Sequence, residues 1–236
     1  MNSRPQPRIS SLAFTLIELL TVITIIAILM GLLFPAIGVV KDQARKAEAR
    51  AAVMQVAAAV KNYYTEYGKY PVADYSAATS SPPTDLRLGD KNSAQATDDN
   101  AELFNILRAK NTGKNTDNAF NPRRISFFEA KSVSDPNAPK SGFADTAGTG
   151  VLGALYDPWG KEYTIIMDCN YNDVISLTGL YSDFTQTSQD GVDTGARTGV
   201  GVFSLGKDGV VASPKDGVTG MYRNGSKVAD DLLSWQ

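Results

Sequence analysis

The sequence predicts an α+β fold in which one long amino-terminal helix precedes a small antiparallel β-sheet. Three observations predict this fold. An apolar segment covers residues 14–40, an apolar stripe at helical spacing covers residues 44–67, and short alternating segments bounded by turn residues begin after residue 151. The 236 residues are enough for one moderate domain and one membrane helix.

Residues 14–40 have the length and hydropathy of a membrane helix. About 27 residues in a helix span roughly 40 Å, which is enough to cross a bilayer. Arg4 and Arg8 precede the segment, and positive charge before a spanning helix favours a cytoplasmic amino terminus, so the rest of the chain is expected outside. The one charge within the segment is Glu18. A carboxylate at this depth is costly, so we expect it to be functional.

Helical character continues beyond the apolar segment. Residues 41–50 are charged, rich in alanine and composed of strong helix formers, and Gly68 followed by Pro71 supplies a stop. A helix over residues 14–67 would be roughly 80 Å long. Its second half, within the region 41–72, is amphipathic, so a head domain is expected to pack on it while the first half stays bare.

The head is expected in two parts. Residues 73–150 form a loop-rich insertion, because they are rich in Ser, Thr, Asp and Asn and are interrupted by prolines; one short helix is expected over residues 99–110. Residues 151–236 form a β-sheet region, with strands expected over residues 161–167, 172–177 and 199–205.

The composition excludes several function classes. The formal net charge of −2 lacks the basic excess typical of nucleic-acid-binding proteins, so no nucleic-acid partner is predicted. The chain has no histidine, which removes imidazole acid–base catalysis and the commonest metal ligand. It also has no Gly-x-Ser-x-Gly motif and no phosphate loop, and no enzyme is predicted. Its single cysteine, Cys169, cannot form an internal disulfide and is expected to be a buried strand residue.

The residues at the start of the apolar segment resemble a known processing site. Residues 13–18 read AFTLIE and resemble the site at which type IV pilins and type II secretion pseudopilins are cleaved. The resemblance implies that residues 1–13 are a leader, that a prepilin peptidase cuts between Ala13 and Phe14, and that it methylates the new amino-terminal Phe14. Pro35 falls where the family carries its helix-kinking proline. The implied fold is the pilin-like lollipop, whose helix is transmembrane in its first half and packs on the head in its second.

Glu18 has a physical role in this interpretation. After cleavage the ammonium group of Phe14 would lie in hydrocarbon, where Glu18 of a neighbouring subunit is able to neutralise it. Such a pair would favour addition of subunits at the fibre base and would fix their axial register. The alternative is a plain single-pass anchor that tolerates one acid.

Three carboxyl-terminal motifs narrow the resemblance to the major pseudopilin of type II secretion systems. They are the turn DPWG at residues 157–160, the run FSLGKDG at residues 203–209, and the acidic pair before Trp235. The resemblance implies a calcium ion held by Asp208, Asp230, Asp231 and the Leu205 carbonyl. Calcium prefers six to eight oxygen ligands, which this set supplies in part. The alternative is that these residues are turn aspartates at a solvated end of the chain.

The resemblance implies a structural role in a filament. We expect a homo-oligomeric helical fibre, the pseudopilus of a type II secretion system, whose growth from the inner membrane drives protein export. The implied partners are minor pseudopilins, the prepilin peptidase and the inner-membrane assembly platform. The chain is expected to be a single-pass inner-membrane protein, with a cytoplasmic amino terminus before processing and a periplasmic head. The alternative is a subunit of a surface type IV pilus, which serves adhesion, twitching or DNA uptake.

Overall fold

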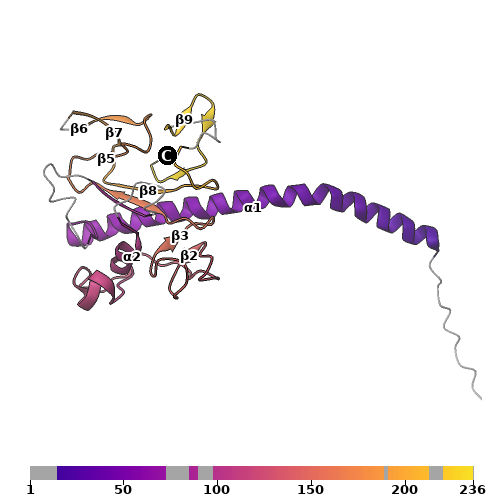
Figure 1. Cartoon of the computed structure of the whole chain (residues 1–236), viewed down its shortest axis with the longest axis horizontal. Coiled ribbons are helices and arrows are strands. Elements are labelled where there is room, and N and C mark those ends of the chain that lie inside the picture. The colour runs from indigo at the N-terminus through magenta and orange to yellow at the C-terminus, as the bar shows by residue number, and fades with distance from the viewer. Residues whose placement is uncertain (1–14, 73–84, 90–97, 189–190, 213–219, 236) are drawn as a thin grey trace, which may run out of the picture. The chain divides into compact units, whose positions relative to one another are not determined.

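The computed structural model describes residues 15–72, 85–89, 98–188, 191–212 and 220–235. The chain forms two compact units, Met1–Ala44 and Arg45–Gln236, which we call the stem and the head. One helix, α1, covers Leu16–Tyr67 and contributes residues to both. The order of elements, a long helix followed by short antiparallel strands, confirms the predicted α+β fold (Figure 1).

In the stem, α1 begins directly after Thr15 and continues through Pro35. The predicted helix over residues 14–67 therefore matches the observed element within two residues at its start. Sixteen large apolar side chains of the stem are between 39% and 82% exposed: Leu16, Ile17, Leu19, Leu20, Val22, Ile23, Ile25, Ile26, Ile28, Leu29, Met30, Leu33, Phe34, Ile37, Val39 and Val40. Across the described residues, no helix meets the combined length and hydropathy needed to cross a membrane.

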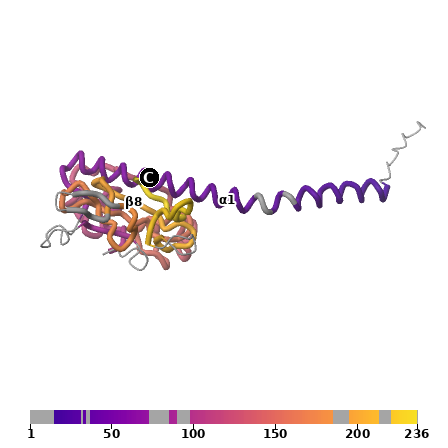
Figure 2. The backbone as a smooth tube through the Cα atoms, turned by 90° about the horizontal axis from the view of Figure 1, so that it is seen from above, coloured from indigo at the N-terminus to yellow at the C-terminus, as the bar shows by residue number. Residues whose placement is uncertain are grey.

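In the head, α1 ends where the sequence predicts. Gly68 adopts φ +68°, a left-handed conformation that glycine tolerates best, and its N–H donates to the Tyr64 carbonyl at 2.8 Å. The face of α1 that carries Val53, Val56 and Val60 is fully buried and joins the main core of the head. The second half of α1 thus lies along the head beside β8 (Figures 1 and 2).

The main sheet is antiparallel and has four strands in the order β1-β4-β8-β11. These are β1 Leu86–Leu88, β4 Thr164–Met167, β8 Val200–Ser204 and β11 Leu232–Leu233. Ile165 of β4 pairs with Val202 of β8, and both side chains are fully buried in the core that includes α1. The predicted strands over residues 161–167 and 199–205 are confirmed in shorter form.

Smaller elements surround this sheet. The predicted strand over residues 172–177 appears as β5 Ile175–Ser176, which joins β7 Gly191–Ala196 and β6 Thr185–Ser188 in a three-stranded sheet. Two further antiparallel pairs of strands are present. One joins β2 Gly142–Phe143 to β3 Leu155–Tyr156, and the other joins β9 Arg223–Asn224 to β10 Lys227–Val228.

The segment 73–150 supplies ordered elements as well as loops. The helix expected over residues 99–110 is confirmed as α2 Ala101–Leu107, and a 3-10 helix, η1, covers Gly113–Asn118. This segment also supplies β1, an edge strand of the main sheet. Its loops are tied down by buried amides: the Asn100 side chain donates to the carbonyls of Leu155 at 3.1 Å and Tyr163 at 2.9 Å, and accepts from the Leu155 N–H at 2.9 Å.

Cys169 is buried as predicted, but it is not in a strand. It lies in the bend directly after β4, because the chain leaves the sheet at Asp168 to form a tight turn. The carboxylate of Asp168 accepts the N–H groups of Asn172 at 3.1 Å and Asp173 at 2.9 Å and so organises this turn. Burial raises the pKa of the Cys169 thiol to about 11, which disfavours the reactive thiolate.

Candidate functional site

The first candidate site is the amino-terminal end of α1. Ala13 and Phe14, the predicted cleavage and methylation residues, lie outside the described residues. Glu18 lies in the first turn and is exposed. Its Oε2 accepts hydrogen bonds from the Thr15 N–H at 2.8 Å and from Thr15 Oγ1 at 2.7 Å, while its own N–H donates to Thr15 Oγ1 at 3.2 Å.

These three bonds form a capping box, in which a Thr before the helix and a Glu three residues later satisfy each other's backbone N–H groups. Thr15 therefore belongs to the site, although the sequence interpretation did not single it out. The Thr-x-x-Glu spacing before an apolar run is the local signal that identifies it. Glu18 thus stabilises the start of the helix in the isolated chain. Pro35, the second predicted assembly residue, lies further along the same helix.

The second candidate site is the set of carboxylates near the carboxyl terminus. Asp230 Oδ2 accepts the N–H of Lys207 at 2.7 Å and that of Asp208 at 3.3 Å, so the turn after β8 is bound to the segment before β11. Gly206 makes this approach feasible, because it has φ +67° and a Cβ there would meet the Asp230 carbonyl oxygen at 2.5 Å. Leu205, whose carbonyl is the fourth predicted ligand, immediately precedes this glycine and is fully buried.

Asp231 is the most deeply buried of the three aspartates, at 1% exposure. Its Oδ2 accepts hydrogen bonds from the Tyr181 hydroxyl at 2.9 Å and from the Ala212 N–H at 3.0 Å. Burial, together with the negative charges of Asp230 and Asp208, raises the pKa of Asp231 to about 7. The three predicted aspartates are therefore near enough to repel one another.

The donor set fits a hard cation in part. Asp208 Oδ2 and Asp231 Oδ1 are buried and have no hydrogen-bond partner among the described residues, and a cation would satisfy both. The oxygens do not form a ready cage, since within the described ranges no group of three or more His, Cys, Asp or Glu side chains is arranged to hold a metal ion. Calcium would require these carboxylates to converge further.

The structure joins two of the carboxyl-terminal motifs through a contact that the sequence interpretation missed. Ser204 Oγ, at the end of β8, donates to Asp157 Oδ2 at 2.6 Å. Asp157 Oδ1 accepts the N–H groups of Trp159 and Lys161, each at 2.9 Å. Asp157 is fully buried, and burial raises its pKa. The turn at residues 157–160 and the run at residues 203–209 thus form one unit beside the carboxylate set.

Comparison with known proteins adds to this description of the site. The chain is similar to type IV major pilins. Two proteins described as type IV major pilin protein PilE1, both from Neisseria gonorrhoeae, are each 39% identical to it over 74 residues, which is 31% of this chain and 45% and 41% of the relatives. The chain therefore spans less than half the length of the curated relatives that it matches. No family model matches it, and no solved structure matches it.

The similarity to type IV pilins agrees with the long helix followed by antiparallel sheets. This similarity supports the resemblance to type IV pilins. It does not distinguish a subunit of a pilus from a subunit of a pseudopilus.

Proposed function

We propose that the chain is a structural, non-enzymatic subunit of a helical filament of the type IV pilin kind. The observation that carries this proposal is the stem: sixteen large apolar side chains are exposed along residues 16–40. Contiguous exposed apolar surface of this extent is characteristic of an interaction surface. Bundling the stems of neighbouring copies would bury it, and the similarity to type IV major pilins points to the same assembly.

We further propose that the filament is the pseudopilus of a type II secretion system. The support for this finer statement is the order of the DPWG turn, the FSLGKDG run and the acidic pair before Trp235. The structure brings the first two together through Asp157 and Ser204. In this role the chain would act with minor pseudopilins and the inner-membrane assembly platform to drive protein export.

A surface type IV pilus is the second candidate, because the curated relatives that match are major pilins.

The two candidates share the same processing. Prepilin peptidase would remove residues 1–13 and methylate Phe14. Before assembly, the exposed apolar stem would lie in the inner membrane with the head in the periplasm.

Charge pairing would then guide assembly. The new ammonium group at Phe14 needs a partner, and Glu18 of a neighbouring copy would supply it. In the isolated chain both bonds from Thr15 are made to Oε2 of Glu18. Oε1 accepts no hydrogen bond from the described residues and so is the oxygen available to an incoming ammonium group.

We also propose calcium as a stabilising ligand of the head. Asp208, Asp230, Asp231 and the Leu205 carbonyl would hold it, and the ion would supply the positive charge that this set of carboxylates lacks. The support is the pair of buried, unpartnered oxygens on Asp208 and Asp231. The ion would have no part in a reaction; it would fix the turn after β8 against the end of the chain.

The filament proposal is tested by immunogold electron microscopy of cells that overexpress the chain together with the assembly machinery of its host. We expect labelled fibres that disappear when the prepilin peptidase is deleted. Labelled protein that stays in the membrane fraction of peptidase-positive cells, with no fibres in any preparation, would overturn the proposal.

A further inference from the structure

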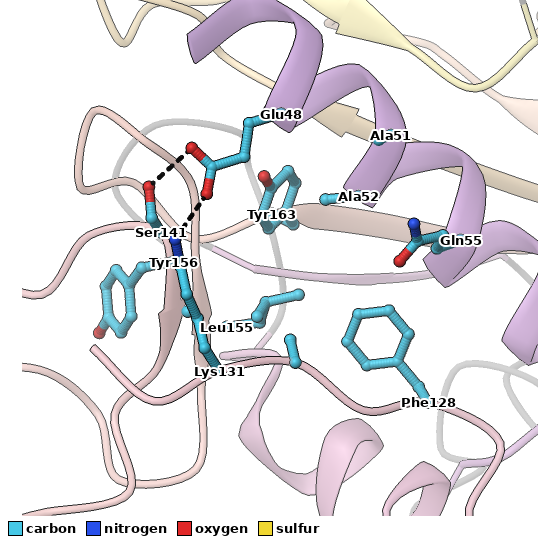
Figure 3. A pocket seen from close by; sticks show the side chains of 12 residues that line it. Glu48, Ala51, Ala52, Gln55, Phe128, Lys131, Ser141, Leu155, Tyr156 and Tyr163 are labelled. Carbon is cyan, nitrogen blue, oxygen red and sulfur yellow. Dashed lines mark hydrogen bonds and ion pairs between the residues drawn. The ribbon is translucent and has the colours of Figure 1, made fainter. Parts of the chain in front are cut away.

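The head contains a cavity of about 210 Å³ between α1 and the loops that precede β3 (Figure 3). Its walls are mostly apolar and include Ala51 and Ala52 of α1, the ring of Phe128, and Leu155 of β3, beside the side chain of Gln55. The hollow exists because α1 presents two alanines at this point, where larger side chains would fill the space. Small-molecule sites in proteins usually measure about 300–1,000 Å³, so the cavity suits one or two protein side chains better than a cofactor.

The rim of the cavity is polar. Glu48 of α1 lies at the mouth and accepts hydrogen bonds from Lys131 Nζ at 3.0 Å and from Ser141 Oγ at 3.3 Å (Figure 3). Both charged side chains are substantially exposed, with 43% of Glu48 and 67% of Lys131 accessible. An exposed ion pair of this kind contributes little to stability, so Glu48 can exchange its partner for another cation at small cost.

We propose that this cavity is a docking hole for a second copy of the same chain, and that the occupant is the segment of the neighbouring stem at Val39 and Val40. This inference rests on the proposed filament function and names one surface through which it would operate. Both valines are exposed, at 64% and 67%. Lys41 follows them directly and is exposed, so a docked valine would bring a lysine to the acidic Glu48 at the rim.

The proposed occupant comes from another copy of the chain. Val39 and Val40 belong to the stem, whereas the residues that line the cavity belong to the head. A knob and a hole at different places on one molecule form a head-to-tail contact. Such contacts extend into open fibres instead of closing as two-fold dimers, which agrees with a filament subunit.

A cysteine cross-link tests the contact directly. The only native cysteine is buried, so introduced cysteines react alone. We expect the full chain with V40C and A51C to give a ladder of disulfide-linked multimers in sheared fibres after mild oxidation, while either single variant gives none. The matched control pairs V40C with A58C, since Ala58 is an exposed alanine of α1 that does not line the cavity. Fibres of the V40C/A51C variant without a ladder, or an equal ladder from the A58C pair, would overturn the proposal.

Filling the hole supplies an independent measurement. A52F should occupy the cavity, lower the yield of sheared fibres at least about tenfold and leave the melting temperature of the detergent-solubilised chain unchanged, whereas A58F should match the unmodified chain in both. Unchanged fibre yield from folded A52F would contradict the proposal. Failure of the unmodified chain itself to form fibres would instead contradict the filament function, so the two failures are distinguishable.

Discussion

Thr15 and Glu18 define the chemistry at the start of α1. The Glu18 carboxylate caps the helix, and we also expect it to pair with the ammonium group of a neighbouring subunit in the fibre. Oε2 accepts both hydrogen bonds from Thr15. The capping role therefore uses one oxygen, and the proposed pairing with a neighbouring ammonium group uses the other. Variants at the two positions separate these roles.

Glu18→Leu is expected to leave the protein membrane-inserted but to reduce sheared fibres to less than about a tenth of the normal amount, since it removes one partner of a pair formed away from water. Thr15→Ala breaks the capping box and keeps the carboxylate, so it should retain most fibre formation. The measurement is the amount of the chain in sheared and membrane fractions by immunoblotting. Normal fibres from Glu18→Leu would refute the charge-pairing model.

Arg108 stabilises the head at a place outside the proposed sites. Its guanidinium makes a two-pronged ion pair with Asp145, at 2.7 and 2.8 Å, and lies 3.7 Å from the centre of the Phe143 ring. The Arg108 side chain is only 10% exposed. Arg108→Ala should therefore lower the free energy of unfolding by about 2 kcal/mol, and Arg108→Lys should recover little of it, because lysine offers neither the fork nor the flat stacking surface.

The same pair predicts a pH dependence. The hydrogen bond from Arg108 is the main cause that lowers the pKa of Asp145 below its ordinary value of 3.8. A lowered pKa means that the pair stabilises the fold fully above the ordinary value and loses this contribution as the pH falls through the lowered one. Urea unfolding should show the difference between the native chain and Arg108→Ala at pH 7 and a smaller difference near pH 3. A difference that grows on acidification would contradict this assignment.

At the scale of elements, the sequence predicts those whose signals are local. The apolar stripe and Gly68 place the end of α1, and the clustered apolar residues 103–107 place α2, because helical periodicity and stop signals lie within a few residues of each other. The strands β1 and β11 have three and two residues, too few to show alternation. Their identity depends on pairing with β4 and β8.

The candidate sites likewise divide into those with a local sequence signal and those formed by distant segments. The Thr15–Glu18 cap has a local signature, whereas Asn100 binds Leu155 and Tyr163, more than fifty positions away, and gives no signal in the sequence. The contact of Ser204 with Asp157 likewise joins distant segments. Resemblance to a family pointed to both segments without indicating that they touch.

The proposed calcium ion belongs to this scale too, since it would join the turn after β8 to β11. Adding calcium to the calcium-free chain in detergent should raise its melting temperature, and EDTA should reverse the rise, because the ion relieves the repulsion among Asp208, Asp230 and Asp231. Asp208→Asn should reduce the response. Thr116→Ala, which alters a solvent-exposed side chain of η1, should keep it. A melting temperature that is the same in calcium and in EDTA would remove the ion from the proposal.

At the scale of the whole molecule, the two proposed filaments, pseudopilus and surface pilus, have to be told apart. The exposed stem suits a pilus and a pseudopilus equally, since both assemble from apolar helices. The distinction therefore has to come from the phenotype of cells. The carboxyl-terminal motifs favour secretion, whereas the matching relatives are major pilins.

Deleting the gene from its host should leave exported proteins in the periplasm, while surface fibres and twitching remain normal, because a pseudopilus acts between the inner and outer membranes. Complementation with the native chain should restore export, and complementation with Glu18→Leu should not. Export is measured by comparing the proteins of the medium with those of the periplasm in each strain. Normal export together with lost twitching, adhesion or DNA uptake would contradict the secretion assignment and establish the surface pilus in its place.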